Sequence, residues 1–233
     1  MSDTIKFYGL LKKREDLNLE QFSKYWREVH AEIAQKTMRL THYVQNHRIE
    51  KEVPGLPLPD FHGVAESIAR NLEAALAFPN TRTYREGVYK DEPNFMEGHA
   101  TSIFAKEHVI IPGPKIEQDT PSVKLMTFFQ RRQGMSVEEC HDYWLNGHAP
   151  LVPRTPGLMR YVQNHVLLET YEEFNPPFDG IAELWWPDMT SYEIAIKSPE
   201  LRQEQWKDTG KFANGKTSVG MLCNEVRIVW NKG

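Results

Sequence analysis

The pentapeptide Tyr-Val-Gln-Asn-His occurs twice in the chain, as residues 43–47 and again as residues 161–165. The two copies belong to a longer match, because residues 5–47 align without a gap with residues 123–165 at a constant shift of 118 (123 − 5). The same shift superposes two more pairs of identical dipeptides: Tyr25-Trp26 on Tyr143-Trp144, and His30-Ala31 on His148-Ala149. Chance does not supply these identities at one shift, so the chain is an internal duplication.

Beyond this block the halves remain similar, although the shift changes by one residue and the similarity fades in the middle of each half. It returns near Glu107 and Glu225, again at a shift of 118 (225 − 107). A segment with the composition of a linker, residues 112–121, lies between the copies. We therefore expect a first module at residues 1–112, a linker at 113–121 and a second module at 122–233.

The composition is that of an ordinary globular protein. Hydrophobic residues make up 40% of the chain and charged residues 26%, and the formal net charge is −4. No tract of Lys and Arg suggests a nucleic-acid or membrane partner. Cys140 and Cys223 stand in hydrophobic patterns, which predicts buried thiols rather than disulfides or metal ligands. With no signal-like segment at the start, we expect a cytoplasmic protein, either a monomer or a homodimer.

Each half is predicted to run strand, helix, strand, strand, helix, strand. The predicted strands are short apolar or alternating segments: 5–11, 43 onward, about 61–68 and about 102–111 in the first half, and 123–129, 161 onward, about 178–186 and about 219–230 in the second. The predicted helices start at four places: the capping boxes Asn18-x-x-Gln21 and Ser136-x-x-Glu139, and near Leu72 and Ser191.

This order of elements is the ferredoxin-like βαββαβ motif. A four-stranded antiparallel sheet with helices on one face leaves its other face bare, and an apolar face needs a cover. Two tandem modules can cover each other by packing sheet to sheet. We therefore predict an α+β fold in which both modules form one α/β barrel within a single chain.

The second half carries a set of motifs that resembles the EthD family of the dimeric α/β-barrel superfamily. These motifs are Tyr143-Trp144-x3-His148-Ala-Pro-Leu151, Pro156-Gly-Leu-x-x-Tyr161-Val-Gln-Asn-His165 and Phe178-Asp179-Gly180-x-Ala-Glu183-Leu-Trp. The first half keeps most of them but departs at residues 31–33 and at His62, which stands where the second half has Asp179. The resemblance implies a small-molecule enzyme of catabolism or biosynthesis, a class that often works without a bound cofactor.

Polar side chains recur at matched positions in both halves. His30 and His148 follow Trp26 and Trp144 by four residues, on or beside the apolar helix face, and a nearby helix C-terminus would favour the protonated form of His148. Alternate side chains of a β-strand lie on the same face of the sheet. The following four sets are therefore each expected to share one strand face: Tyr43, Gln45 and His47; Tyr161, Gln163 and His165; His62, Val64 and Glu66; Asp179, Ile181, Glu183 and Trp185.

If these strand faces turn toward the helices, each half has a polar pocket between sheet and helices. We then expect His47 within reach of His30, and His165 within reach of His148. The candidate catalytic residues are His148, His165, Tyr161, His30, His47, Tyr43, Asp179 and Glu183. The candidate substrate-binding residues are Tyr143, Gln163, Asn164, Trp185, Tyr25, Gln45, Glu66 and His62.

Imidazole, phenol and carboxylate groups among aromatic rings suit general acid–base chemistry on a small aromatic or hydrophobic substrate. The leading hypothesis is a cofactor-independent lyase or isomerase. A cofactor-free oxygenase would use the same base, and a non-catalytic module that binds a hydrophobic small molecule is the alternative from another class. A haem held by one histidine ranks third, and no pair of histidines has metal-ligand spacing. A histidine on an apolar helix face is also commonly structural, and Trp26 and Trp144 are predicted to be core residues.

The two pockets are expected to be unequal, with the second half as the working one. After a duplication, only one copy has to keep the original function. The departures from the family pattern fall mostly in the first half. Asp179 beside an imidazole would stabilise its charged form, whereas His62 at the matched position would not.

Overall fold

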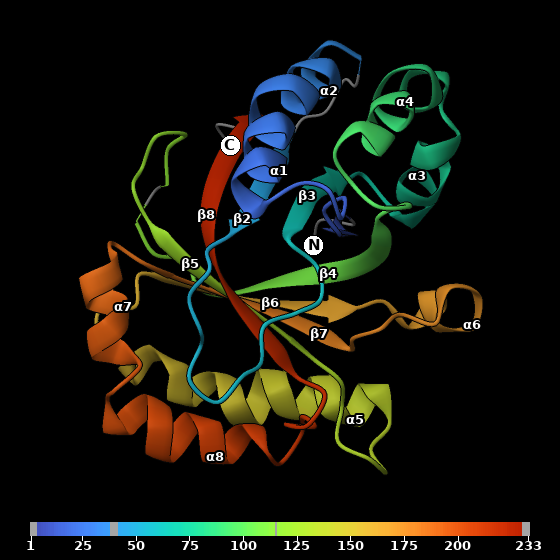
Figure 1. Ribbon diagram of the computed structural model, residues 1–233. Coiled ribbons are helices and arrows are strands. Elements are labelled where there is room, and N and C mark those ends of the chain that lie inside the picture. The colour runs from blue at the N-terminus through green and yellow to red at the C-terminus, as the bar shows by residue number, and fades with distance from the viewer. Residues whose placement is uncertain (1–3, 38–41, 115, 230–233) are drawn as a thin grey trace.

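The computed structural model describes residues 4–37, 42–114 and 116–229. Both halves follow the predicted order of elements (Figure 1). The strands are β1 Ile5–Leu11, β2 Tyr43–Arg48, β3 Gly63–Ala69, β4 Thr101–Ile111, β5 Val123–Phe129, β6 Arg160–Val166, β7 Gly180–Trp186 and β8 Val219–Val229. The α-helices are α1 Leu19–Tyr25, α2 Ala31–Thr37, α3 Leu72–Ala77, α4 Tyr89–Asp91, α5 Val137–Asp142, α6 Tyr171–Phe174, α7 Met189–Ala195 and α8 Trp206–Thr209.

The strands form one closed antiparallel barrel in the order β1-β3-β2-β8-β5-β7-β6-β4. The two sheets face each other as predicted, and they are also hydrogen-bonded at both edges. The long last strands make these joints. The start of β4 pairs with β1, and its end, Ala105–Ile111, pairs with β6 of the other half. The start of β8 likewise pairs with β5, and its end pairs with β2. The duplicated chain therefore contains a complete barrel.

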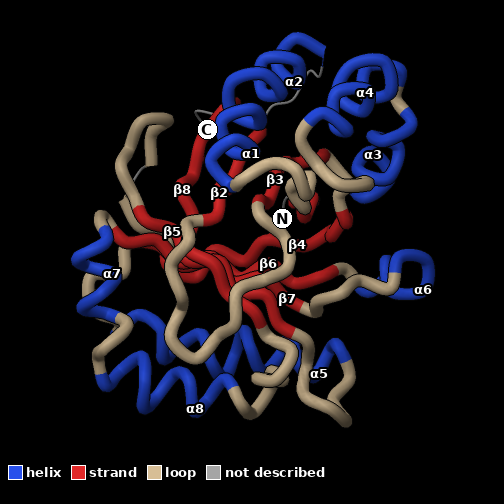
Figure 2. Tube along the Cα trace, in the orientation of Figure 1, coloured by secondary structure: helices blue, strands red, loops and turns tan. Residues whose placement is uncertain are grey.

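Helices surround the barrel on the outside, with α1 to α4 over the first half and α5, α7 and α8 over the second (Figure 2). The capping boxes form as predicted: the side chain of Asn18 accepts from the N–H of Gln21, and that of Ser136 from the N–H of Glu139. In each half the first helix continues through a π-helical turn that ends at the histidine, Trp26–His30 and Tyr143–His148. No helix within the described part of the chain has the length and apolar character that a membrane span needs.

Matched glycines let these helices approach the sheet closely. A Cβ on Gly63 would lie 2.5 Å from the Trp26 ring, and a Cβ on Gly180 would lie 2.7 Å from the Trp144 ring. Only glycine fits under each tryptophan, because real Cβ contacts do not come this close. The indoles therefore fix the position of the π-helical turns, and thus of His30 and His148.

The barrel interior holds a buried ion network that obeys the pseudo-twofold symmetry of the duplication. Lys6 lies 2.9 Å from Glu66, 2.7 Å from Glu183 and 3.0 Å from Glu107. Its counterpart Lys124 contacts the corresponding carboxylates, Glu66 at 3.0 Å, Glu183 at 2.9 Å and Glu225 at 3.2 Å. Each lysine therefore bridges both halves, and an apolar cluster that includes Tyr8, Met126 and Met221 is also buried there.

Candidate active site

A His–Asp–Tyr arrangement lies between the second sheet and its helices. Nδ1 of His148 is 2.9 Å from Oδ2 of Asp208, and the hydroxyl of Tyr143 donates to Oδ1 of the same carboxylate at 2.9 Å. His148 is the last residue of the π-helical turn, and Asp208 lies on α8. An acceptor on Nδ1 selects the tautomer with hydrogen on Nδ1, which leaves Nε2 as a free base. Among the described residues, Nε2 has no hydrogen-bond partner.

Burial controls the protonation of this pair. Burial lowers the pKa of His148 below its ordinary value, and the hydrogen bond to Asp208 offsets part of this effect. The expectation that a helix C-terminus favours the protonated form of His148 is therefore wrong, and a 3₁₀ turn, Ala149–Arg154, continues the chain past the histidine. Burial also acts to raise the pKa of Asp208, but hydrogen bonds from Lys211, His148 and Tyr143 lower it overall. The pair is a neutral imidazole beside a carboxylate at neutral pH.

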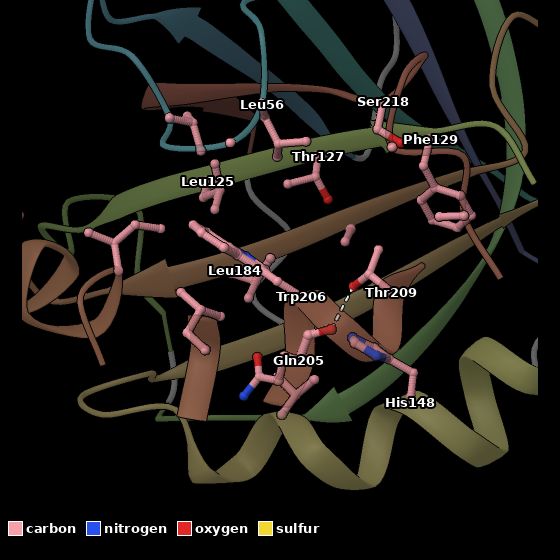
Figure 3. Close-up of a pocket in the computed structure, with 18 of the residues that line it drawn as sticks. Leu56, Leu125, Thr127, Phe129, His148, Leu184, Gln205, Trp206, Thr209 and Ser218 are labelled. Carbon is pink, nitrogen blue, oxygen red and sulfur yellow. Dashed lines mark hydrogen bonds between the residues drawn. The ribbon is translucent and has the colours of Figure 1, made fainter. Parts of the chain in front are cut away.

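His148 points into a cavity of about 270 Å³ (Figure 3). Its walls are mainly aromatic and aliphatic, with Phe129, Trp144, Trp186, Trp206 and Phe212 among them. Within the described residues, no Asp, Glu, Lys or Arg lines this cavity. The polar groups besides His148 are hydroxyls and one amide, from Thr127, Tyr161, Gln205, Thr209 and Ser218. The space suits an uncharged molecule with one or two oxygens.

A loop from the first half closes this cavity. Val53, Pro54, Gly55 and Leu56 line it, and Leu56 lies on the far side of the space from His148 (Figure 3). The loop is anchored on β8 at both ends, since the N–H of Ile49 donates to Leu222 O at 2.8 Å and the N–H of Gly220 donates to Pro57 O at 3.0 Å. The cavity is therefore completed only when both halves are present.

Tyr161 is placed to donate a hydrogen bond into the cavity. Its hydroxyl oxygen accepts from Trp144 Nε1 at 3.0 Å and from Gln163 Nε2 at 3.0 Å. Both lone pairs of the hydroxyl oxygen thus accept hydrogen bonds, and the hydroxyl hydrogen is available to donate to a bound molecule. Burial raises the pKa of Tyr161, so the group remains a neutral donor. Such a donor can stabilise negative charge that develops on a bound oxygen.

The first half repeats the same arrangement around a smaller space. Nδ1 of His30 is 2.8 Å from Oδ2 of Asp91, and the hydroxyl of Tyr25 donates to Oδ1 at 2.8 Å. Burial also lowers the pKa of His30. Tyr43 accepts from Trp26 Nε1 at 3.1 Å, as Tyr161 does from Trp144. The cavity here is about 110 Å³.

The expectation that His47 and His165 point into these cavities is wrong. Both lie on the helix side of their strands, but neither is among the residues that line these two cavities. His165 stacks on the Trp144 ring at 4.7 Å between centroids, and His47 packs on Trp26 at 4.6 Å. Nε2 of each donates to the amide oxygen of the neighbouring glutamine, Gln163 or Gln45, at 3.0 Å. These residues support the aromatic wall and orient the glutamines that hold the tyrosines.

The candidate residues on β3 and β7, the third strand of each half, do not face the helices as expected. Their polar face turns into the barrel, so Glu66 and Glu183 belong to the ion network and Trp185 donates to Glu225 at 2.9 Å. Asn164 also lies away from the cavity, with its amide donating to Ile181 O at 3.1 Å.

Asp179 and His62 likewise do not line the two cavities, and they immediately precede β7 and β3. Asp179 binds Arg131 and Tyr171, and Nδ1 of His62 accepts from the N–H of Lys13 at 3.3 Å. Asp179 is therefore not the carboxylate beside His148, and it does not distinguish the two sites.

The sequence analysis missed the two aspartates that hold the histidines. Asp91 and Asp208 lie at a shift of 117 (208 − 91), in the region where the similarity between halves fades. A signal was present, because Tyr89-Lys-Asp91 corresponds to Trp206-Lys-Asp208, and each aspartate is followed four residues later by phenylalanine. A gapped comparison at this shift would have found both.

The fold and this site define a duplicated α/β barrel with a small-molecule cavity. The chain belongs to the EthD family, whose domain model matches residues 14–99 and residues 132–216. No protein with a curated description matches the chain. Within residues 4–37, 42–114 and 116–229, no group of three or more His, Cys, Asp or Glu side chains is arranged to hold a metal ion.

Solved structures share the fold at low sequence identity. An anthrone oxidase-like protein matches with a TM-score of 0.65 and 12% identity, over 98% of this chain and 95% of that one. A candidate monooxygenase from Fusobacterium nucleatum subsp. nucleatum matches with a TM-score of 0.61 and 11% identity, over 97% and 93%. A candidate chlorite dismutase matches with a TM-score of 0.55 and 10% identity, over 98% and 97%. These likenesses establish the barrel fold alone.

Proposed function

We propose that the second-half cavity is the active site of a cofactor-independent enzyme that removes a proton from a small, uncharged aromatic substrate. The observation that carries the proposal is the His148–Asp208 pair at 2.9 Å in an apolar cavity. A cavity without a His–carboxylate pair would instead favour a binding module. The reaction class is that of a lyase or isomerase.

Each group of the site has a role in this reaction. Nε2 of the neutral imidazole of His148 accepts the proton, and Asp208 stabilises the imidazolium that forms. The hydroxyl of Tyr161 donates to the oxygen on which negative charge develops. The absence of charged groups from the described cavity wall disfavours phosphorylated or carboxylated substrates, because their charges would be left unpaired.

A second candidate reaction begins with the same step. The anthrone oxidase-like protein and the candidate monooxygenase share this fold, and their names refer to oxidation. In a cofactor-free oxygenase, the substrate carbanion gives its electrons directly to O₂ after His148 has removed the proton. Oxygen consumption that depends on His148 would favour this outcome over isomerisation or elimination.

The test is a deuterium-exchange assay with a panel of anthrones and other phenolic ketones that carry a weakly acidic C–H. NMR follows incorporation of deuterium from D₂O, and quenching of tryptophan fluorescence reports binding. We expect His148→Gln to lower the exchange rate by about 10²–10⁴-fold. His30→Gln, the matched control in the first half, is expected to retain most of the rate.

Two results would count against the proposal. If His30→Gln is the inactive variant and His148→Gln is nearly normal, the assignment of the working half is reversed. If wild-type protein binds panel members with no exchange and no oxygen consumption, the cavity is a binding site without catalysis. Circular dichroism of each variant separates loss of chemistry from loss of folding.

A further inference from the structure

The cavity of the first half has a different chemical character from that of the second. Its volume is about 110 Å³, and aromatic rings surround it, with Trp26, Phe78, Tyr84 and Phe95 among them. Unlike the second-half cavity, it is lined by a carboxylate, that of Glu92. Glu92 occupies the position of Thr209 in the other copy at the shift of 117 (209 − 92).

The charges around the two cavities also differ. In the second half Nζ of Lys211 lies 2.6 Å from Asp208 and compensates its charge. The matched position in the first half is Asn94, whose neutral amide donates to Asp91 at 3.0 Å. Asp91 and Glu92 are thus adjacent acids, and within the described residues their only ion-pair partners are histidines.

Glu92 is an incompletely satisfied buried carboxylate. The residue is 5% exposed, and the hydroxyl of Tyr84 donates to Oε1 at 2.6 Å. Oε2 has no hydrogen-bond partner, and its nearest basic group is Nδ1 of the exposed His99 at 3.6 Å. A buried carboxylate oxygen without a donor is costly, and a bound donor would remove that cost.

We propose that the first-half cavity is a binding site for a small organic ammonium ion. The ammonium donates to Glu92 and to Nε2 of His30, which the bond from Nδ1 to Asp91 leaves as an acceptor. The aromatic rings supply their negative faces to the cation, as in other sites that recognise alkylammonium groups. The proposal is independent of the reaction assigned to the second half.

The electrostatics around Glu92 support a cationic ligand. Burial raises the pKa of Glu92, which reflects the cost of its charge in this space. A cation next to the carboxylate reverses this cost. The size sets a limit, because a cavity of roughly 150 Å³ is enough for benzene. An amine with about four to six heavy atoms therefore fits 110 Å³.

The experiment compares three probes of similar size and different charge: isopropylammonium, isopropanol and isobutyrate. Binding is followed at constant ionic strength through the indole N–H resonances of the tryptophans. Trp26 lines the first cavity, whereas Trp144, Trp186 and Trp206 line the second and serve as an internal control. We expect isopropylammonium to shift Trp26 and to bind at least about tenfold more tightly than isopropanol, because the hydrogen bond to Glu92 is charge-assisted.

Two variants localise the effect. Glu92→Gln keeps the shape and an acceptor for Tyr84 but removes the charge, and we expect it to lose the preference for the ammonium ion. Glu97→Gln removes the same charge at an exposed position outside the cavity and should bind as wild type does.

Equal binding of isopropanol and isopropylammonium would overturn the proposal. So would an ammonium preference that survives in Glu92→Gln, a response at Trp206 in place of Trp26, or no response to the ammonium ion at all. If Glu92→Gln does not fold, the comparison of the three probes on wild-type protein decides the question alone.

Discussion

The two halves of the barrel are nearly alike inside and different outside. In the interior, Lys6 and Lys124 each bind three carboxylates in matched arrangements. Outside, the cavities are about 270 Å³ and about 110 Å³, although each has the same His–Asp–Tyr arrangement. The interior joins the halves, so a change in either copy affects both. The two outer cavities share no lining residue among those described, so each could diverge.

Two of the differences lie beside the aspartates that hold the histidines. Thr209 and Lys211 in the second half stand where the first has Glu92 and Asn94. A loop of the first half, residues 53–56, covers the second cavity, whereas all described residues that line the first cavity come from the first half. We propose on these grounds, rather than on Asp179, that the halves have unequal roles and that the second is the catalytic one.

The largest expected effect tests the symmetry of the interior. Replacing Lys124 by methionine leaves buried carboxylates without their cation, and we expect a loss of about 3–5 kcal/mol in the free energy of unfolding. Lys6→Met should cost a similar amount, because the two lysines share Glu66 and Glu183 as partners. Urea unfolding measures both.

A loss below about 1 kcal/mol in either variant would contradict a role of the network in joining the halves. A large difference between the variants would show that the interior is less symmetric than its distances indicate. Lys36→Met, at an exposed ion pair with Glu32, is the control and should cost less than about 1 kcal/mol.

The next effect concerns the histidines behind the aromatic walls. Burial, aided by Arg27, lowers the pKa of His47 to about 3, and burial, aided by His141 and His108, lowers that of His165 to about 2. The unfolded chain then binds protons first as the pH falls below about 6.5, so stability is lost on acidification. Each histidine should contribute a slope of about 1.4 kcal/mol per pH unit between roughly pH 6 and 4.

Unfolding free energies of wild type, His47→Phe and His165→Phe over this pH range measure these slopes. In each variant, the slope of the unfolding free energy against pH should decrease by about 1.4 kcal/mol per pH unit, whatever the stability of the variant at pH 7. An unchanged slope in His165→Phe would mean that this imidazole is protonated equally in the folded and unfolded chain. A change in only one variant would mark a real difference between the halves.

Much of the fold follows from local patterns in the sequence. The capping boxes at Asn18 and Ser136 use only residues within one turn, and the repeat allows each half to confirm the other's strands. The direction of a strand face does not follow from period two. In a closed barrel under helices both faces are buried, so Glu66 and Tyr43 are equally compatible with either side.

The site was less predictable because it depends on contacts between distant segments. His148 was identified from its helix, but its partner Asp208 lies 60 residues further along the chain. The loop of residues 53–56 reaches the other half only because the barrel closes. Lys6 and Lys124 match at the shift of 118 (124 − 6), yet nothing local indicates that a lysine in an apolar strand meets three carboxylates.

The smallest expected effect separates the two sites most directly, through the pH dependence of activity. The base is the neutral imidazole of His148, so activity is retained above its pKa and lost as the pH falls through it. Burial is the main cause of the lowered pKa, the hydrogen bond to Asp208 raises it, and the charge of Lys211 lowers it further. Lys211→Asn, which installs the first-half residue, should therefore raise the pKa of His148 and move the acid limb of the exchange rate to higher pH.

Because Lys211 is 62% exposed, solvent screens its charge and the change in rate at pH 7 should be roughly twofold or less. The reciprocal variant, Asn94→Lys, adds a cation beside Asp91 and should leave the pH profile of the reaction unchanged. It should instead weaken the binding of isopropylammonium in the first cavity, since the added charge repels the ligand. An acid limb that moves to lower pH in Lys211→Asn, or a profile that responds to Asn94→Lys, would mean that the two cavities do not have the separate roles assigned to them.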